Sequence, residues 1–264
     1  MHIAYSPDGT QIAYDKEGEG PALIVVDGAL CTRMSNAKTE LASLLAPHVT
    51  TYSYDRRGRG DSGDTLPYAV DREIEDIEAL IDEAGGSASL YGHSSGAALA
   101  MEAAVRLGSG KVTRLAMYEA PYNDDPAAQR AWGEYITELT EALADGRPGD
   151  GVAAFMTLVG TPADQIAGLR QAPFWAGMEA IAPTLAYDHT AILGKDGAVP
   201  AEQAARVQVP ALVMYGDASF PFMAGTARTL SQAMPQASLR ALPGQTHEVS
   251  PAALAPVLAD FLAG

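Results

Sequence analysis

The sequence predicts an α/β protein in which a mostly parallel sheet has helices on both faces and an inserted helical cap. Short continuous apolar runs alternate with helical segments along most of the chain, as in parallel strands joined by helical crossovers. One such run passes through Gly92–Gly96 directly into an Ala-rich helical stretch. Between 122 and 207 the alternation stops, and helical pieces are joined by Gly- and Pro-containing turns. We therefore expect a core of residues 1–121 and 208–264 and a cap of residues 122–207.

The first part of the chain predicts an antiparallel entry followed by parallel strands. Asp8-Gly9 lies between two short strand-like runs within residues 2–15, which is a hairpin signal. The loop at 55–63 is Gly-rich but lacks the Lys-Ser/Thr ending of a phosphate-binding loop, so we expect no nucleotide there. The elements expected before this loop are a strand at 21–26, a helix at 38–45 and a strand at 49–54.

A strongly amphipathic helix is expected over residues 70–84. Its apolar side chains share one face at helical spacing, and they are Val70, Ile74, Ile77, Ile81 and Ala84. Acidic side chains occupy the other face, and they are Glu73, Glu75, Asp76, Glu78, Asp82 and Glu83. We expect this acidic face to be exposed to solvent, because charged side chains are rarely buried.

The later elements restore the alternation of strands and helices after the cap. A last helix is expected to begin with Ser250 as N-cap and Pro251 at N1, because these residue types are favoured at those positions. The other expected elements are a strand at 112–118, cap helices at 131–143 and 152–159, a strand at 210–217, a helix at 223–234 and a strand at 237–242.

The pentapeptide Gly92-His93-Ser94-Ser95-Gly96 is typical of a nucleophile elbow, because a strand precedes it and a helix follows it. Such a turn holds its central residue in a strained backbone conformation, with the hydroxyl above the sheet. Gly92 and Gly96 lack the Cβ atoms that would clash where strand and helix pass closest. We therefore interpret Ser94 as a nucleophile.

The amino-acid composition limits which kinds of binding partner we expect for this protein. A net charge of −16 repels phosphate backbones and anionic lipid surfaces, so we expect neither nucleic acid nor membrane as a partner. No apolar run reaches the length of a membrane span, and the first residues do not resemble a secretory signal, which predicts a cytoplasmic protein. A single cysteine, Cys31, excludes an internal disulfide and a cysteine-based metal cluster. We expect a small-molecule substrate, no metal or organic cofactor, and either a monomer or a homodimer.

Four segments together resemble the α/β-hydrolase family over nearly the whole chain. They are the loop Asp27-Gly28-Ala29-Leu30, the Gly-rich segment 55–63, the elbow at 92–96, and Gly244-Gln245-Thr246-His247. The resemblance implies an α/β-hydrolase sheet with a helical cap. It also implies the serine hydrolase branch of the family, because the epoxide hydrolase and dehalogenase branches use aspartate as the nucleophile.

A serine hydroxyl needs a base within hydrogen-bond reach. The family order of serine, acid and histidine along the chain favours His247 as this base. Of the other histidines, His2 lies at a terminus, His48 precedes a strand and His93 lies on the elbow. His189 in the cap is a weaker rival that could contact the substrate.

The acid is where this chain departs from the family pattern. Many members have Gly-x-x-Asp after the seventh strand, whereas Gly216-Asp217-Ala218-Ser219 has serine at that place. Some relatives take the acid from the end of the sixth strand, where this chain has Glu119. Glu119 is therefore our preferred acid, with Asp217 and a Ser–His dyad as alternatives.

Acyl transfer also needs N–H donors for the developing oxyanion. By position in the family these are the backbone N–H groups of Ala29 and Ser95. Gly28 lets the first loop approach closely, and Asp27 is expected to brace that loop.

The cap supplies large apolar side chains, and Trp175, Met178 and Tyr187 are candidates for the substrate pocket. A site under a cap has an apolar wall, which favours a mainly apolar substrate. The sequence therefore predicts a serine hydrolase that cleaves a carboxylic ester or lactone through an acyl-enzyme. The alternatives are a cofactor-free perhydrolase, acyltransferase or lyase on the same scaffold, and a non-catalytic small-ligand receptor.

Overall fold

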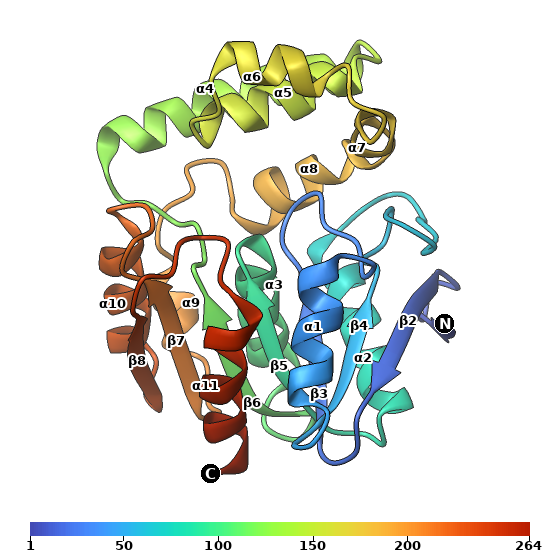
Figure 1. Ribbon diagram of the computed structural model, residues 1–264, viewed down its shortest axis with the longest axis vertical. Helices are drawn as coiled ribbons and strands as arrows, with labels where there is room; N and C mark the ends of the chain where they lie inside the picture. Colours follow the sequence, from blue (N-terminus) through green and yellow to red (C-terminus); the bar gives the residue numbers. More distant parts are fainter.

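The computed structural model describes residues 1–264, apart from the side chain of Asn36, and contains an eight-stranded sheet with helices on both faces (Figure 1). β1 (His2–Tyr5) and β2 (Gln11–Glu17) form an antiparallel hairpin, and β2 also pairs antiparallel with β4. All other neighbours pair parallel, in the order β1-β2-β4-β3-β5-β6-β7-β8. The parallel strands are β3 (Ala22–Val26), β4 (Thr50–Tyr54), β5 (Ala88–His93), β6 (Val112–Tyr118), β7 (Ala211–Gly216) and β8 (Ala237–Leu242). The expected fold class, including its antiparallel entry, is confirmed.

The helices that cover the sheet are α1 (Asn36–Leu45), α2 (Val70–Glu83), α3 (Ser95–Leu107), α10 (Met223–Ala233) and α11 (Pro251–Ala263). Alternate strand residues point to opposite faces of a sheet, so neighbouring side chains belong to different cores. Ile24 and Leu90 pack in the core that contains α2, α3 and α10. Val25 and Tyr91 pack in the core under α1 and α11, which lie in front of the sheet in Figure 1.

Between β6 and β7 the described chain forms helices and no strand. We call these helices the inserted helices (residues 126–204). All but the last of them lie toward the end of the sheet at which the parallel strands finish, whereas the helix at 201–204 lies beside the sheet against α3 and α10 (Figure 1). They are α4 (Pro126–Ala144), α5 (Pro148–Leu158), α6 (Ala163–Leu169), α7 (Trp175–Ile181), α8 (Thr184–Ala186), the π-helical turn η1 (Tyr187–Ile192) and α9 (Ala201–Ala204).

The first two inserted helices begin earlier than the sequence predicts. α4 starts at Pro126 because the Asp125 carboxylate accepts hydrogen bonds from the N–H groups of Ala127 and Ala128, at 2.9 and 3.0 Å. α5 starts at Pro148, another proline at the first position of a helix. The apolar spacing that predicts these two helices begins only after their N-terminal capping residues.

The expectation of a fully solvated acidic face on α2 is wrong. Glu73 and Asp76 are each only 1% exposed, because both carboxylates bind buried arginines from the loop that follows β4. Glu73 makes two hydrogen bonds to the Arg56 guanidinium, at 2.6 and 2.7 Å, and Asp76 makes two to Arg57, at 2.7 and 2.8 Å. These bidentate pairs fasten α2 to the Gly-rich loop at 55–63.

Breaking one of these pairs is expected to destabilise the protein strongly. Glu73→Gln keeps the shape of the side chain but removes the charge opposite Arg56, so the free energy of unfolding should fall by about 3 kcal/mol. Glu78→Gln is the matched control on the same helix, because Glu78 is partly exposed and should change stability by less than about 0.5 kcal/mol. Urea unfolding of both variants measures the difference, and equal effects would contradict the buried pair's role.

Every helix in the described chain is too short or too polar to cross a lipid bilayer.

Candidate active site

Ser94 occupies a sharp turn between β5 and α3. Its backbone has φ 57° and ψ −129°, a conformation that residues with a Cβ rarely adopt. The turn is crowded, because a Cβ on Gly96 would lie 2.2 Å from the carbonyl oxygen of Val26. Helix α3 can therefore approach the end of β3 this closely only with glycine at position 96.

Backbone strain is concentrated around this turn. Within the described chain, the non-glycine residues with positive φ are Leu30 (56°), Ser94 (57°) and Glu119 (49°). Each follows the end of a different parallel strand, β3, β5 or β6. Strained residues of this kind cost about 1–3 kcal/mol each and cluster at functional sites.

His247 lies within hydrogen-bond distance of both Ser94 and Glu119. Nδ1 of His247 is 2.7 Å from Oε2 of Glu119, and Nε2 of His247 is 3.1 Å from Oγ of Ser94. A carboxylate only accepts hydrogen bonds, so Nδ1 carries the hydrogen and Nε2 is left to accept the Ser94 hydroxyl hydrogen. This arrangement prepares the imidazole to remove the hydroxyl proton.

The Glu119 carboxylate is buried and fully hydrogen-bonded, with only 2% of the residue exposed. The Gly216 N–H donates to Oε1 at 2.8 Å, and the Ser219 hydroxyl donates to Oε2 at 2.7 Å. Burial alone would raise the pKa of Glu119, but the hydrogen bonds from His247, Gly216 and Ser219 lower it below its usual value. The carboxylate therefore stays charged beside His247.

Two further side chains hold the loop that carries His247. The ring Nε2–H of His93 donates to the carbonyl oxygen of His247 at 3.0 Å, and the Tyr118 hydroxyl donates to that of Thr246 at 2.6 Å. Burial lowers the pKa of His93 to about 4, so its ring is neutral at neutral pH. These contacts anchor the backbone on both sides of the Thr246–His247 peptide bond.

The loop after β3 lies directly against Ser94. A Cβ on Gly28 would be 2.9 Å from the Cβ of Ser94, so only glycine fits at this contact. Within the described residues, the N–H groups of Ala29 and Ser95 donate to no carbonyl or side chain. Both are therefore free to bind an oxyanion.

Buried charged side chains hold the loop after β3 in place. Arg56 donates to the carbonyl oxygen of Asp27 at 3.1 Å, and Arg59 donates to that of Gly28 at 2.6 Å. The carboxylate of Asp27 forms an ion pair with Lys38 at 2.6 Å, while burial raises its pKa. Asp27 thus supports the loop and makes no contact with His247.

The three residues predicted to line the substrate pocket pack against other side chains of the inserted helices or against Tyr68. Trp175 is 5% exposed within the hydrophobic cluster of the inserted helices and donates its indole N–H to Glu179 at 2.9 Å. Met178 packs against the same cluster. Tyr187 stacks on Tyr68 with ring centroids 3.8 Å apart. Asp217, the alternative acid, is exposed and accepts a hydrogen bond from the Gly244 N–H at 2.6 Å.

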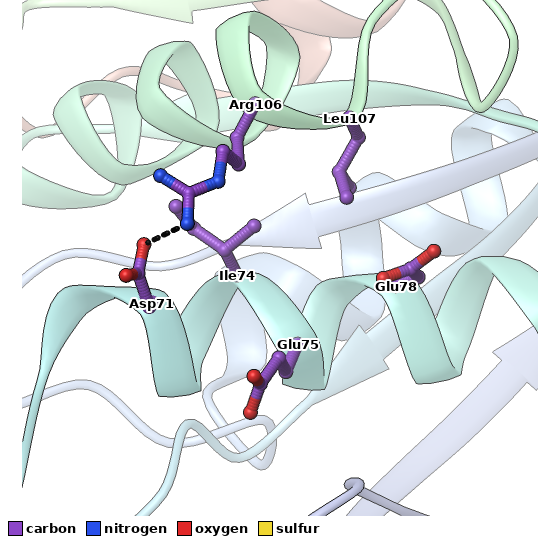
Figure 2. Close-up of a pocket in the computed structure, with 6 residues that line it drawn as sticks. All are labelled: Asp71, Ile74, Glu75, Glu78, Arg106 and Leu107. Carbon is purple, nitrogen blue, oxygen red and sulfur yellow. Dashed lines mark ion pairs between the residues drawn. The ribbon is translucent and has the colours of Figure 1, made fainter.

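A surface hollow of about 330 Å³ lies away from these residues, between α2 and α3 (Figure 2). Figure 2 shows that its rim is charged, with an ion pair between Asp71 and Arg106. Its lining includes none of Ser94, His247 and Glu119, so we locate the candidate site by the chemistry of these three side chains. Among the described residues, no group of three or more His, Cys, Asp or Glu is placed to hold a metal ion.

Sequence reasoning missed the supporting residues of the site. The sequence pattern marks Ser219 only as the place of a missing aspartate, whereas its hydroxyl binds Glu119. It marks Arg56 and Arg59 only as part of a loop that does not bind phosphate, whereas they donate to the carbonyl oxygens of Asp27 and Gly28. The available signal was the combination of several arginines in one loop with an acidic helix directly after it.

The free energy of unfolding is expected to decrease on acidification from about pH 7 to about pH 5. Burial lowers the pKa of His93 and of His189 to about 4, whereas an unfolded histidine titrates at about 6.5. The unfolded chain therefore binds these protons first, and each histidine costs about 2 kcal/mol at pH 5. Urea unfolding at both pH values should show that His189→Phe loses about 2 kcal/mol less than the wild type. Equal losses would contradict the neutral, buried state of His189.

A family model and several solved structures match the chain. Residues 32–258 match the model of the alpha/beta hydrolase family. An alpha/beta hydrolase from Sphaerobacter thermophilus is 48% identical, with 98% of this chain and 99% of that chain covered and a TM-score of 0.85. An enol-lactonase from Burkholderia xenovorans LB400 (21% identity, 100% of both chains, TM-score 0.70) and an esterase from Thermogutta terrifontis (18% identity, 99% and 97%, TM-score 0.73) share the fold.

Proposed function

The chain belongs to the alpha/beta hydrolase family, and on that premise we propose that it is a serine hydrolase acting on a carboxylic ester or lactone. The observation that carries this proposal is the hydrogen-bonded line from Ser94 through His247 to Glu119. The strained turn at Ser94 and the free N–H groups of Ala29 and Ser95 supply the other parts that acyl transfer needs.

In the first half of the reaction, Ser94 Oγ attacks the carbonyl carbon while His247 Nε2 accepts its proton. Glu119 remains charged and stabilises the imidazolium that forms, since its carboxylate holds Nδ1–H. The N–H groups of Ala29 and Ser95 donate to the oxyanion. His247 then gives the proton to the leaving alcohol oxygen, and an acyl ester on Ser94 remains.

In the second half, His247 removes a proton from a water molecule that attacks the acyl ester. The tetrahedral intermediate collapses when His247 returns the proton to Ser94 Oγ, which releases the carboxylic acid. For a lactone, the alcohol and the acid are two ends of one product. No metal or organic cofactor is required for any of these steps.

A small, mainly apolar substrate is supported by the side chains near the loop after β3. Ala29 and Leu30 pack against the cluster of the inserted helices, and the half-buried Phe155 and Met156 belong to the same group. The names of the enol-lactonase and esterase neighbours agree with an ester or lactone as the substrate. We infer that the inserted helices act as a cap over Ser94.

The alternative of a non-catalytic receptor loses its main support. That alternative rested on the missing aspartate after β7, but Glu119 supplies a buried carboxylate to His247. An epoxide hydrolase or dehalogenase mechanism would need an aspartate nucleophile at the elbow, where this chain has Ser94.

The direct test is covalent labelling by a fluorophosphonate together with turnover of p-nitrophenyl esters of increasing chain length. We expect stoichiometric labelling of Ser94, located by peptide mass analysis, and faster turnover of short or medium acyl chains. Product analysis in the presence of hydrogen peroxide or an alcohol distinguishes hydrolysis from perhydrolase or acyltransferase activity. Absence of both labelling and turnover would refute the proposed function.

A further inference from the structure

The π-helical turn η1 buries two consecutive polar residues, Asp188 and His189, which are 0% and 3% exposed. The side chains of these two residues contact different partners. Asp188 forms ion pairs with Arg56 and Arg59, whereas His189 enters an aromatic group. Short π-helical turns are uncommon and occur frequently at functional sites, which makes His189 a candidate functional residue.

Aromatic rings surround the His189 imidazole. Its ring centroid lies 5.3 Å from that of Trp132 and 4.9 Å from that of Phe155. Its Nδ1 is 2.6 Å from the hydroxyl oxygen of Tyr135. Trp132 and Phe155 are both only half-buried, so this aromatic group retains an open side.

The position of the ring hydrogen follows from the hydrogen bonds of Tyr135. Tyr135 is 4% exposed, and within the described residues its hydroxyl has no partner other than His189. If Nδ1 carried the hydrogen, the buried Tyr135 O–H would have no acceptor. Tyr135 therefore donates to Nδ1, and the hydrogen of the neutral ring lies on Nε2.

The Nε2–H group of His189 has no partner in the described chain. It is also not among the polar atoms there that are both unpartnered and sealed from solvent, such as Ser95 Oγ and Thr190 Oγ1. The Nε2–H donor therefore keeps a small area in contact with solvent, although the residue is only 3% exposed. A nearly buried side chain with one free donor in aromatic surroundings is a recognition point for a single polar atom.

His189 shares neighbouring side chains with the loop that would bind the oxyanion. Arg56 and Arg59, which hold Asp188, also donate to the carbonyl oxygens of Asp27 and Gly28. Phe155, which packs on His189, belongs to the cluster that contacts Ala29 and Leu30. His189 is thus placed to meet a part of the substrate remote from the carbonyl that Ser94 attacks.

The charges around His189 favour an uncharged ligand atom. Arg56 and Arg59 are balanced by the carboxylates of Asp188 and Glu73, so no unpaired charge is left to attract an anion. Resting on the proposed function, we propose that His189 Nε2–H selects esters or lactones that carry an uncharged acceptor oxygen, a ketone or ether, away from the scissile carbonyl. His189 is then a specificity-determining residue and takes no part in proton transfer.

The test compares p-nitrophenyl hexanoate with its 4-oxo and 5-oxo counterparts, which differ by one carbonyl in place of a methylene. The wild type is expected to favour at least one oxo ester by about tenfold in kcat/KM, since a hydrogen bond to a desolvated donor contributes about 1 kcal/mol or more. In His189→Phe this preference should disappear through a higher KM for the oxo ester. Plain hexanoate has no acceptor oxygen for this donor, so its kcat/KM should fall less than that of the oxo ester.

Two further variants separate recognition from a structural effect. His189→Gln keeps an N–H donor at the end of the side chain and should restore part of the preference. Tyr135→Phe releases Nδ1 and should weaken the preference, because the ring hydrogen is no longer held on Nε2.

The outcomes distinguish this inference from the proposed function. Wild-type turnover and Ser94 labelling without any preference for an oxo ester would overturn the role of His189 alone. Equal losses on both ester types in His189→Phe, with no rescue by His189→Gln, would do the same. Absence of labelling and turnover in the wild type would overturn the proposed function and, with it, this inference.

Discussion

Ser94→Ala is expected to lower kcat for ester hydrolysis by several orders of magnitude without unfolding the protein. The substitution removes the hydroxyl that lies 3.1 Å from His247 Nε2, and no other group can form the acyl ester. The Cβ is retained, so the turn with φ 57° keeps its shape and Tm should change by only about 2 °C. Steady-state kinetics and thermal unfolding of the same preparation measure both effects.

Ser95→Ala is the matched control for this prediction. The Ser95 hydroxyl is buried without a hydrogen-bond partner in the described chain, so its loss should leave stability equal or slightly higher. The Ser95 N–H remains for the oxyanion, and kcat should stay within about threefold. Retention of more than about a tenth of wild-type kcat in Ser94→Ala would show that Ser94 is not the nucleophile.

Glu119→Gln is expected to reduce kcat by about 10³ to 10⁴ with a much smaller change in KM. The amide is close in size to the carboxylate but cannot stabilise the imidazolium that develops in the transition state. Its NH₂ group would also favour the wrong ring tautomer of His247, since Oε2 now accepts the Nδ1–H hydrogen bond. The split between kcat and KM distinguishes this role from a general loss of substrate binding.

Asp217→Asn is the control for the acid. Asp217 is exposed and binds the Gly244 N–H, so its substitution should change kcat by less than about threefold. Both variants should be compared at matched fractions of folded protein, because Glu119 is buried and its substitution also weakens the contacts to Gly216 and Ser219. A larger kcat loss in Asp217→Asn than in Glu119→Gln would reverse the assignment.

The fold could be predicted from local patterns because strands, helices and turns each have short-range signals. The apolar run at 88–93, the elbow glycines and the Ala-rich stretch after them lie within twenty residues. The burial of the acidic face of α2 could not be predicted, because it depends on a long-range contact. Whether Glu73 is solvated depends on Arg56, seventeen positions earlier in a different element. Helical spacing carries no information about such a partner.

The site residues could likewise be predicted only where a local sequence motif marks them. Ser94 has a local motif, but the acid is decided by which strand end comes nearest to His247, a contact that spans 128 positions. The sequence left Glu119 and Asp217 open as alternatives, and the tertiary packing brings Glu119 to Nδ1. The role of Ser219 follows only from coordinates, since its hydroxyl reaches across 100 positions to the carboxylate.

The strained residues Leu30, Ser94 and Glu119 have a consequence for engineering this protein. Glycine tolerates positive φ without the steric cost that a Cβ imposes, so Ser94→Gly removes a local penalty of about 1–3 kcal/mol. Glu119→Gly gains no such advantage, because it also removes the carboxylate that binds Gly216, Ser219 and His247. A library selected only for heat resistance would therefore be drawn toward glycine at position 94 and would lose its activity there. Selection for thermostability has to hold this position constant and seek its gains in elements remote from it.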